Sequence, residues 1–296
     1  MKQHPICVLS VGRSGSSLVT RAINLLGVDL GADDDLMPAT EQNRDGFWES
    51  MPIWSINERL LECLGGSWYR PPRLAPGWTD DERLLGLRQE ATRVVGQLAR
   101  PGVRWGFKDP RTIPLLPFWR EIVGEMDYLI CVRRPHAVIS SVEHMGLPGT
   151  EPLETAMLWL DMNAAALAQT ATERRKLIFY EDWFEDPRRV ARQLAAFIHG
   201  EASPVDPEAL RAIDAFLDPR LRRADEAAIE VVAPELEAMY EHLRLVADPG
   251  ATRRYARDRE TLVAQTLADA FRSRQGAGPQ RSTLVALEHR LQRGLQ

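Results

Sequence analysis

The sequence has few cysteines and no long apolar run, and each shortage argues against a class of protein. Its three cysteines, Cys7, Cys63 and Cys131, are widely separated, which disfavours a zinc site and a disulfide framework. No segment approaches the roughly 18 uninterrupted apolar residues of a membrane span. The first residues leave no room for a secretory signal ahead of the first motif. We therefore expect a cytoplasmic protein without a membrane span.

Lysine is also rare. Only three of the 37 basic side chains are lysines: Lys2, Lys108 and Lys176. An arginine at any one position is therefore weak evidence for a functional role, and a retained lysine is slightly stronger evidence. The formal net charge is −5 at pH 7. Nonspecific nucleic-acid binding needs a basic field, so no nucleic-acid partner is expected. Any phosphate recognition has to be local.

The chain alternates short apolar runs with amphipathic stretches. Runs rich in β-branched and aromatic residues predict buried strands at 6–11, 103–107, 128–132 and 177–180. Amphipathic stretches predict helices at 16–26, 52–64, 80–99, 114–123, 136–144, 152–171 and 187–198. Strands that alternate with helices form parallel units. The sequence therefore predicts an α/β protein with a central parallel sheet covered on both faces.

The pattern becomes wholly helical beyond about residue 204. We predict a core of residues 1–203 and a helical C-terminal part of the same domain, 204–296. The leucines of its last segment, 281–296, recur at helical spacing. That tail is expected either to dock on the core or to join two copies as a homodimer through the C-terminal helices. Residues 65–78 are rich in glycine and proline and predict a loop or lid.

The segment Ser10–Ser17 reads Ser-Val-Gly-Arg-Ser-Gly-Ser-Ser, and it follows the first predicted strand and opens the first predicted helix. At such a place, backbone N–H groups and the helix dipole can bind an anionic phosphate. Glycines allow close approach, hydroxyl groups donate, and a guanidinium suits phosphate or sulfate oxygens. The residues expected to bind the phosphate are Gly12, Arg13, Ser14, Gly15, Ser16 and Ser17.

This loop differs from the loop of nucleoside-triphosphate-binding proteins. That loop ends in Gly-Lys-Ser/Thr, with the lysine on the terminal phosphates and the hydroxyl on magnesium. Here Ser16 follows Gly15, so an ATPase or kinase is disfavoured and no metal is expected. A turn of this composition can also be a tight turn with a serine N-cap and no ligand.

A second motif follows the third predicted strand. Arg133 stands at the end of that strand, and Ser141 lies about two turns into the next predicted helix, which opens with Pro135. Ligands of such sheets bind at the carboxyl ends of the strands. Arg133 and Ser141 are expected to reach one phosphate from two directions. The alternative is an ordinary arginine at a strand end.

Together, these segments resemble the sulfotransferases that use 3′-phosphoadenosine 5′-phosphosulfate (PAPS). Ser10–Ser17 looks like their 5′-phosphosulfate loop, and Arg133–Ser141 looks like their 3′-phosphate motif. Gly106–Arg111 and Phe179–Pro187 are similar to two further segments of the bacterial and tyrosylprotein-type members. The resemblance covers residues 8–200. It implies a P-loop-like three-layer α/β/α fold, PAPS as co-substrate, 3′,5′-ADP as product and no required metal.

The resemblance and the chemistry of sulfuryl transfer together suggest catalytic roles. Negative charge grows on the oxygen that bridges sulfur and the 5′-phosphate, so cations are needed there, and Arg13 and Lys108 are the candidates. Glu49 is the candidate base for the acceptor, since tyrosylprotein-type members carry a base glutamate in a comparable region. The alternative is that Glu49 caps the helix that follows it. His136 and His144 rank below it.

The chain departs from the cytosolic mammalian type, which carries a lysine where Arg13 stands and an Arg-Lys-Gly clamp near the C-terminus. Arg220, Arg222 and Arg223 are the candidates to replace that clamp. The acceptor is expected to be a small molecule, a lipid or a glycan. Aromatic residues near the site would either stack on it or fill the core: Trp48, Trp54, Trp68, Tyr69 and Trp78. A P-loop-like nucleotide kinase and a noncatalytic nucleotide-binding scaffold remain as alternatives.

Overall fold

The computed structural model describes residues 4–40, 46–146, 150–201, 204–217 and 234–247. The chain forms two compact units, one of residues 1–133 with 172–223 and the other of residues 134–171 with 224–296. The division expected at residue 203 stays a prediction. The expected C-terminal helix at 281–296, with its proposed role in a homodimer, lies outside the described residues, as do Arg220, Arg222 and Arg223.

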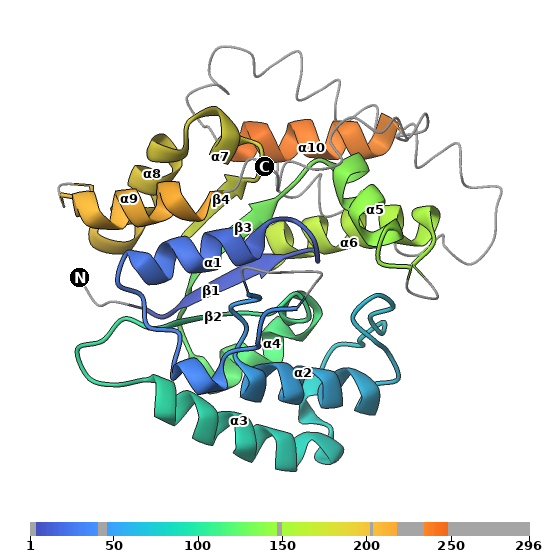
Figure 1. Cartoon of the computed structure of the whole chain (residues 1–296). Helices are drawn as coiled ribbons and strands as arrows, with labels where there is room; N and C mark the ends of the chain where they lie inside the picture. Colours follow the sequence, from blue (N-terminus) through green and yellow to red (C-terminus); the bar gives the residue numbers. More distant parts are fainter. Residues whose placement is uncertain (1–3, 41–45, 147–149, 202–203, 218–233, 248–296) are drawn as a thin grey trace. The chain divides into compact units, whose positions relative to one another are not determined.

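A four-stranded parallel sheet forms the centre of the first unit (Figure 1). Its strands are β1 (Ile6–Ser10), β2 (Gly106–Lys108), β3 (Asp127–Val132) and β4 (Arg175–Phe179), in the order β2-β1-β3-β4. Each neighbouring pair is parallel. Every residue of β1, β2 and β3 is buried, as the continuous apolar runs predict. The predicted α/β class with a central parallel sheet is confirmed.

One face of the sheet packs against α1 (Ser16–Leu25), α8 (Pro187–His199) and α9 (Pro207–Phe216), near the short helix α7 (Asp182–Glu185). Apolar side chains of β1, β3 and β4 form one core cluster with these helices. Asp186 caps α8 by accepting a hydrogen bond from the Arg189 N–H. This layer therefore holds the helix that begins at the predicted phosphate loop.

The other face of the sheet packs against α4 (Thr112–Val123), and α2 (Met51–Cys63) and α3 (Leu85–Leu98) pack on α4 (Figure 1). The rings of Phe107 in β2 and Trp119 in α4 lie 5.6 Å apart. The sheet is therefore the middle layer of three, which confirms the α/β/α arrangement that the resemblance implied.

The second unit is helical in its described residues. It contains α5 (Pro135–Glu143), α6 (Pro152–Gln169) and α10 (Pro234–Ala247), which contact one another. The guanidinium of Arg134 lies 5.0 Å from the centre of the buried Tyr240 ring. Proline occupies the first turn of both α5 and α6, where its missing N–H costs nothing.

Most predicted helices begin and end within two residues of the observed bounds. The predicted helix at 80–99 is wrong at its start, because α3 begins at Leu85 after two short 3-10 turns, Trp78–Asp80 and Glu82–Leu84. Asp81 is extended, and its carboxylate accepts from the Arg83 N–H at 2.9 Å. The predicted strand at 103–107 also begins too early, since the Val103 N–H closes a turn at 3.2 Å.

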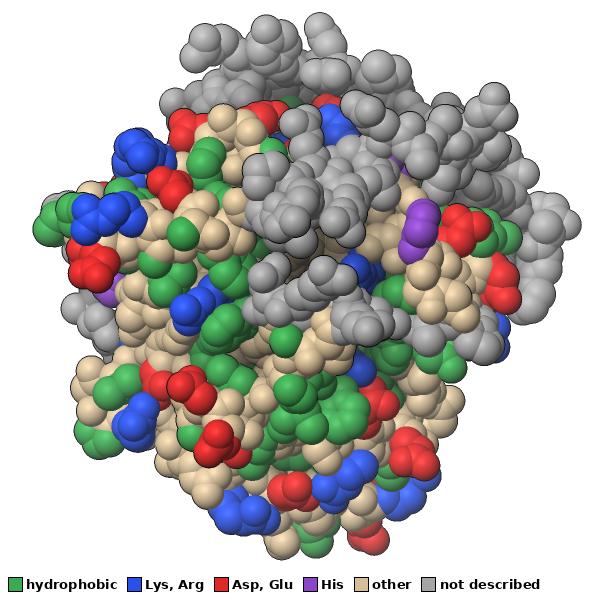
Figure 2. All heavy atoms as spheres, in the orientation of Figure 1, with side chains coloured by type: hydrophobic (Ala, Val, Ile, Leu, Met, Phe, Trp, Pro, Cys, Tyr) green, Lys and Arg blue, Asp and Glu red, His purple; other side chains and the backbone are tan. Residues whose placement is uncertain are grey.

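The loop expected at 65–78 contains no regular element up to residue 77. Two of the cysteines lie buried in strands, Cys7 in β1 and Cys131 in β3, and burial raises the pKa of both thiols. None of the helices in the described ranges is long and apolar enough to cross a membrane. On the face shown in Figure 2, positive and negative side chains are interspersed over the described residues.

Candidate functional site

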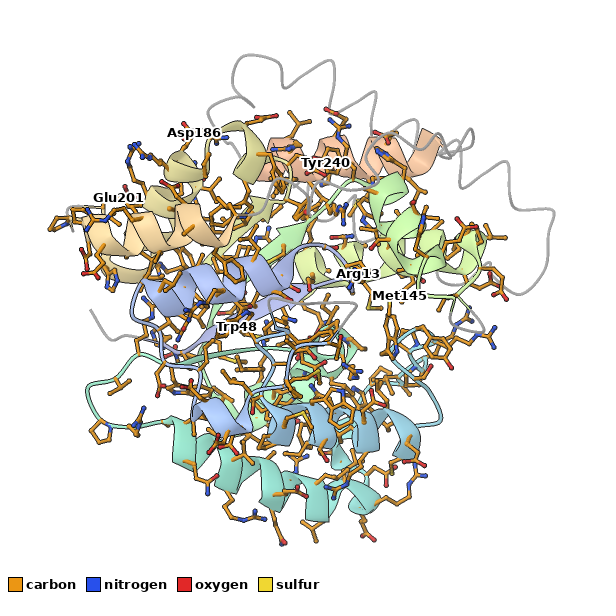
Figure 3. The ribbon with its side chains drawn as sticks, viewed as in Figure 1. Arg13, Trp48, Met145, Asp186, Glu201 and Tyr240 are labelled. Carbon is orange, nitrogen blue, oxygen red and sulfur yellow. The ribbon has the colours of Figure 1, made fainter. Side chains whose placement is uncertain are left out.

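The loop after β1 turns tightly because two of its residues have left-handed backbones. Gly15 has φ 79° and ψ 17°, and Arg13 has φ 70°. This conformation costs a non-glycine residue about 1–2 kcal/mol, so the surroundings must impose it on Arg13. The Ser14 N–H donates to the Val11 carbonyl at 3.3 Å, and α1 starts at Ser16. The predicted strand, loop and helix are confirmed, and Figure 3 shows Arg13 at the turn.

Glycine is required at position 15 because Tyr180 lies directly against it. A Cβ on Gly15 would be 2.2 Å from Tyr180 Cδ2. Tyr180 follows β4 and is 7% exposed, and its ring centroid lies 5.1 Å from that of Phe184. Sequence reasoning did not assign Tyr180 a role at the site. The signal was present in the Tyr-Glu-Asp segment, but nothing local says that this ring reaches the first loop.

The two arginines predicted to bind phosphates meet at this loop. Arg133 Nη1 donates to the carbonyl oxygen of Arg13 at 3.2 Å, and the Arg133 guanidinium lies 4.4 Å from the centre of the Tyr180 ring. Arg133 is buried. Burial lowers the pKa of Arg13, and the nearby Arg133 charge lowers it further. Two cations close enough to repel each other, one of them buried and the other half-buried, favour an anion beside them, because the anion offsets their repulsion.

The loop serines have different surroundings. Ser14 is 2% exposed, and its Oγ has no hydrogen-bond partner among the described residues. A buried hydroxyl in that state costs about 1–3 kcal/mol, which a phosphate oxygen would recover. Ser16 is buried at the start of α1. The Ser17 hydroxyl donates to the Phe47 carbonyl at 3.2 Å. The loop therefore fits an oxyanion.

Glu49 and Lys108, the other predicted catalytic residues, form a buried ion pair beside α1. Lys108 Nζ lies 2.5 Å from Glu49 Oε1 and 3.5 Å from Ser17 Oγ. Lys108 and Glu49 are 3% and 5% exposed. The alternative that Glu49 caps the following helix is wrong, since Ser50 is the N-cap of α2 and its side chain accepts from the Ile53 N–H.

The residues after Lys108 extend this ion pair into a network. Asp109 is fully buried, and its Oδ1 accepts from the Arg111 N–H at 2.7 Å in an Asx-type turn. Arg111 Nη1 lies 3.9 Å from Glu49 Oε2, and Arg111 Nε donates to Glu58 of α2. Burial raises the pKa of Asp109 to about 6. The nearby Glu49 charge also raises this pKa, whereas the Arg111 charge lowers it.

The strand order explains why these groups lie at the same edge of the sheet. β1 lies between β2 and β3, and chain connections run from β1 to β2 and then across to β3. Ligands of such sheets bind at the carboxyl ends of the strands where the order reverses, here between β1 and β3. Arg13 follows β1, Lys108 ends β2 and Arg133 follows β3. Three adjacent strands therefore place these three cations at the same edge of the sheet.

The second motif is divided between the two units. Arg133 is the last residue of its segment of the first unit, whereas Ser141 lies half-buried in α5 of the second. His136, also in α5, lies 3.9 Å from Glu237 of α10. That Arg133 and Ser141 contact the same phosphate stays a prediction.

The aromatic residues near the site are half-buried, and two of them border the site residues. Trp68 lies against the loop, since a Cβ on Gly12 would be 3.2 Å from its Cζ3, and Tyr69 meets Trp68 edge-on at 5.6 Å. Trp48 (Figure 3) precedes Glu49 and has φ 57°. The Arg21 guanidinium lies 4.4 Å from the centre of the Trp48 ring. That these rings contact an acceptor stays a prediction.

No protein-family model matches the chain, and no curated protein matches it. Among solved structures, it is similar to the sulfotransferase domain of the olefin synthase of Synechococcus PCC 7002, with 18% identity, a TM-score of 0.46, and coverage of 82% of this chain and 96% of that one. It is also similar to the sulfotransferase STF1 of Mycobacterium tuberculosis H37Rv, with 13% identity, a TM-score of 0.40, and coverage of 72% of this chain and 71% of that one. A third similar structure is a retinol dehydratase in complex with retinol and PAP, with 16% identity, a TM-score of 0.38, and coverage of 94% of this chain and 85% of that one.

Two of these three structures are described as sulfotransferases, the family that the sequence motifs resemble. Their identities to this chain are below 20%.

Proposed function

We propose that this chain is a sulfotransferase that moves the sulfuryl group of PAPS to a hydroxyl or amine acceptor and releases 3′,5′-ADP. The observation that carries the proposal is that two cations contact the segment that follows β1 and opens α1: Arg133 donates to the Arg13 carbonyl, and Lys108 lies 3.5 Å from Ser17 Oγ. Helix N-termini bind oxyanions, and guanidinium groups bind them with two parallel hydrogen bonds. The lysine that a nucleoside-triphosphate loop requires is replaced by Ser16.

The loop fits the phosphosulfate group of PAPS. The backbone of Gly12–Ser17 would surround the group, the buried Ser14 hydroxyl would donate to one of its oxygens, and Arg13 would supply positive charge. Arg133 would bind the 3′-phosphate while its Nη1 holds the Arg13 carbonyl. Ser141 is proposed for the same phosphate from the sequence motif alone.

Sulfuryl transfer needs in-line positioning and charge stabilisation more than covalent chemistry from the protein. The bond between sulfur and the 5′-phosphate oxygen breaks, a bond from sulfur to the acceptor forms, and the acceptor proton passes to Glu49. Arg13 and Lys108 would stabilise the charge that grows on the bridging oxygen. Lys108 contacts both Glu49 and Ser17 of α1. It therefore lies between the proposed base and the proposed phosphosulfate loop.

A glycan, a lipid or a small metabolite is the proposed acceptor. Trp68 beside Gly12 supports an acceptor with a flat apolar face, because sugar and aromatic rings stack on indole. The cytoplasmic location belongs to the same proposal.

Isothermal titration of the full chain tests the proposal. We expect 3′,5′-ADP to bind without magnesium and more tightly than ATP with magnesium, and radiolabelled PAPS to label a member of a panel of glycans, lipids and phenols. Preference for ATP with magnesium would indicate a nucleotide kinase. Binding of 3′,5′-ADP without transfer to any panel member would indicate a scaffold. If 3′-phosphorylated adenine nucleotides do not bind, the proposal is wrong.

A further inference from the structure

Arg111 contacts the carboxylates of Glu49, Glu58 and Asp109. We propose that Arg111 is a positioning residue for Glu49, which it holds in the orientation needed to accept the proton of the acceptor. This inference rests on the proposed function, because it assumes that Glu49 is the base.

The two oxygens of Glu49 face two different cations. Oε1 lies 2.5 Å from Lys108 Nζ, and Oε2 lies 3.9 Å from Arg111 Nη1. Lys108 ends β2, and Arg111 stands three residues later, directly before α4. Because both cations are held at the end of one buried strand, rotation of the Glu49 carboxylate would break at least one of the two contacts.

Arg111 is itself fixed on several sides. Its Nη1 lies 3.2 Å from Asp109 Oδ1, its Nε donates to Glu58, and its guanidinium lies 5.8 Å from the centre of the Trp54 ring. The Arg111 side chain is 11% exposed. A guanidinium carries a rigid set of donors, so it can hold several carboxylates at once in a way that an ammonium cannot.

A purely structural role is the alternative, because the contact of Arg111 with Glu58 also ties α2 to the end of β2. The two roles differ in their effect on the acid–base step. The charged groups facing Glu49 are Lys108, Arg111 and Asp109. Without the Arg111 charge, the ionised carboxylate is less stabilised, so the acidic limb of the kcat–pH profile should move to higher pH. A tie between elements would not move it.

The test compares Arg111→Met with Arg88→Met. Arg88 is a matched control, since it also joins two elements, through Glu121 of α4 and the Thr79 carbonyl, and lies 5.3 Å from the centre of the Phe118 ring. We expect Arg111→Met to lower kcat on the order of 10- to 100-fold and to move the acidic limb upward by on the order of one pH unit. The affinity for 3′,5′-ADP should stay within about twofold. Arg88→Met should change neither quantity.

A double-mutant cycle with Glu49→Gln separates the two roles. Glu49→Gln should itself cripple transfer with little effect on 3′,5′-ADP affinity. If Arg111 acts through Glu49, adding Arg111→Met to Glu49→Gln causes no further loss of kcat. The inference is wrong if the kcat losses of the two single variants multiply in the double variant, or if the kcat–pH profile of Arg111→Met does not move. In either case, 3′,5′-ADP binding and sulfuryl transfer by the unaltered protein would still support the proposed function.

Arg111→Lys decides the matter if Arg111→Met does not fold. Lysine keeps the charge but cannot reach Glu49, Asp109 and Glu58 together. We expect Arg111→Lys to lower kcat in the otherwise unaltered protein. When Glu49→Gln is already present, adding Arg111→Lys should cause no further loss of kcat. Full activity of Arg111→Lys would show that the fixed donor geometry is not needed, and would overturn the inference.

Discussion

The contact between Gly15 and Tyr180 predicts that a single methyl group at position 15 disrupts the phosphate loop. The Cβ of Gly15→Ala would lie 2.2 Å from Tyr180 Cδ2, far inside carbon–carbon contact distance. The ring cannot move away easily, because it is buried between the Arg133 guanidinium and Phe184. The left-handed backbone at Gly15, with φ 79°, also disfavours alanine.

The cost follows from these two effects. A left-handed alanine costs about 1–2 kcal/mol, and overpacking of a filled site costs about 1–3 kcal/mol more. Together they destabilise the protein by about 2–5 kcal/mol, which lowers Tm by roughly 4–20 °C for a domain of this size. Gly27→Ala isolates the backbone effect, since Gly27 has φ 93° and no described atom lies within 4 Å of the position that a Cβ would take there. It should lose only about 2–8 °C.

Differential scanning calorimetry measures both Tm values, and titration with 3′,5′-ADP measures the state of the loop. Gly27→Ala should bind 3′,5′-ADP like the unaltered protein, whereas Gly15→Ala should lose at least about tenfold in affinity because its loop backbone is displaced. The reasoning is refuted if Gly15→Ala is no less stable than Gly27→Ala, or if it keeps full affinity.

Two further predictions concern the charged residues. Arg13→Ala and Lys108→Ala should lower kcat more than they weaken 3′,5′-ADP binding, and Arg133→Ala should do the reverse. Steady-state kinetics and titration would show the opposite pattern if the roles are exchanged. Burial raises the pKa of Asp109 to about 6, so the folded state binds this proton more tightly than the unfolded chain, and stability should fall as pH rises from about 4 to about 6. Asp109→Asn should flatten that fall in urea unfolding, and an unchanged slope would assign it to other groups.

Local signals in the sequence were sufficient for the elements that carry the site. Buried parallel strands are apolar on both faces, so β1 and β3 could be predicted from continuous apolar runs. The glycines and serines of Ser10–Ser17 predicted the loop, because backbone conformation and helix starts depend on residues close in sequence. The late start of α3 was missed, since the hydrogen bond from Arg83 to Asp81 competes locally with the helix.

The sequence by itself therefore determined the strand–loop–helix unit, the parallel sheet and the list of charged candidates. Tertiary structure alone decided which candidates meet. Glu49 pairs with Lys108 across 59 residues, and Arg133 bonds the Arg13 carbonyl across 120 residues. Tyr180 presses on Gly15 from the end of another strand. Such contacts depend on strand order and on how helices pack on the sheet, and no short stretch of sequence encodes either one.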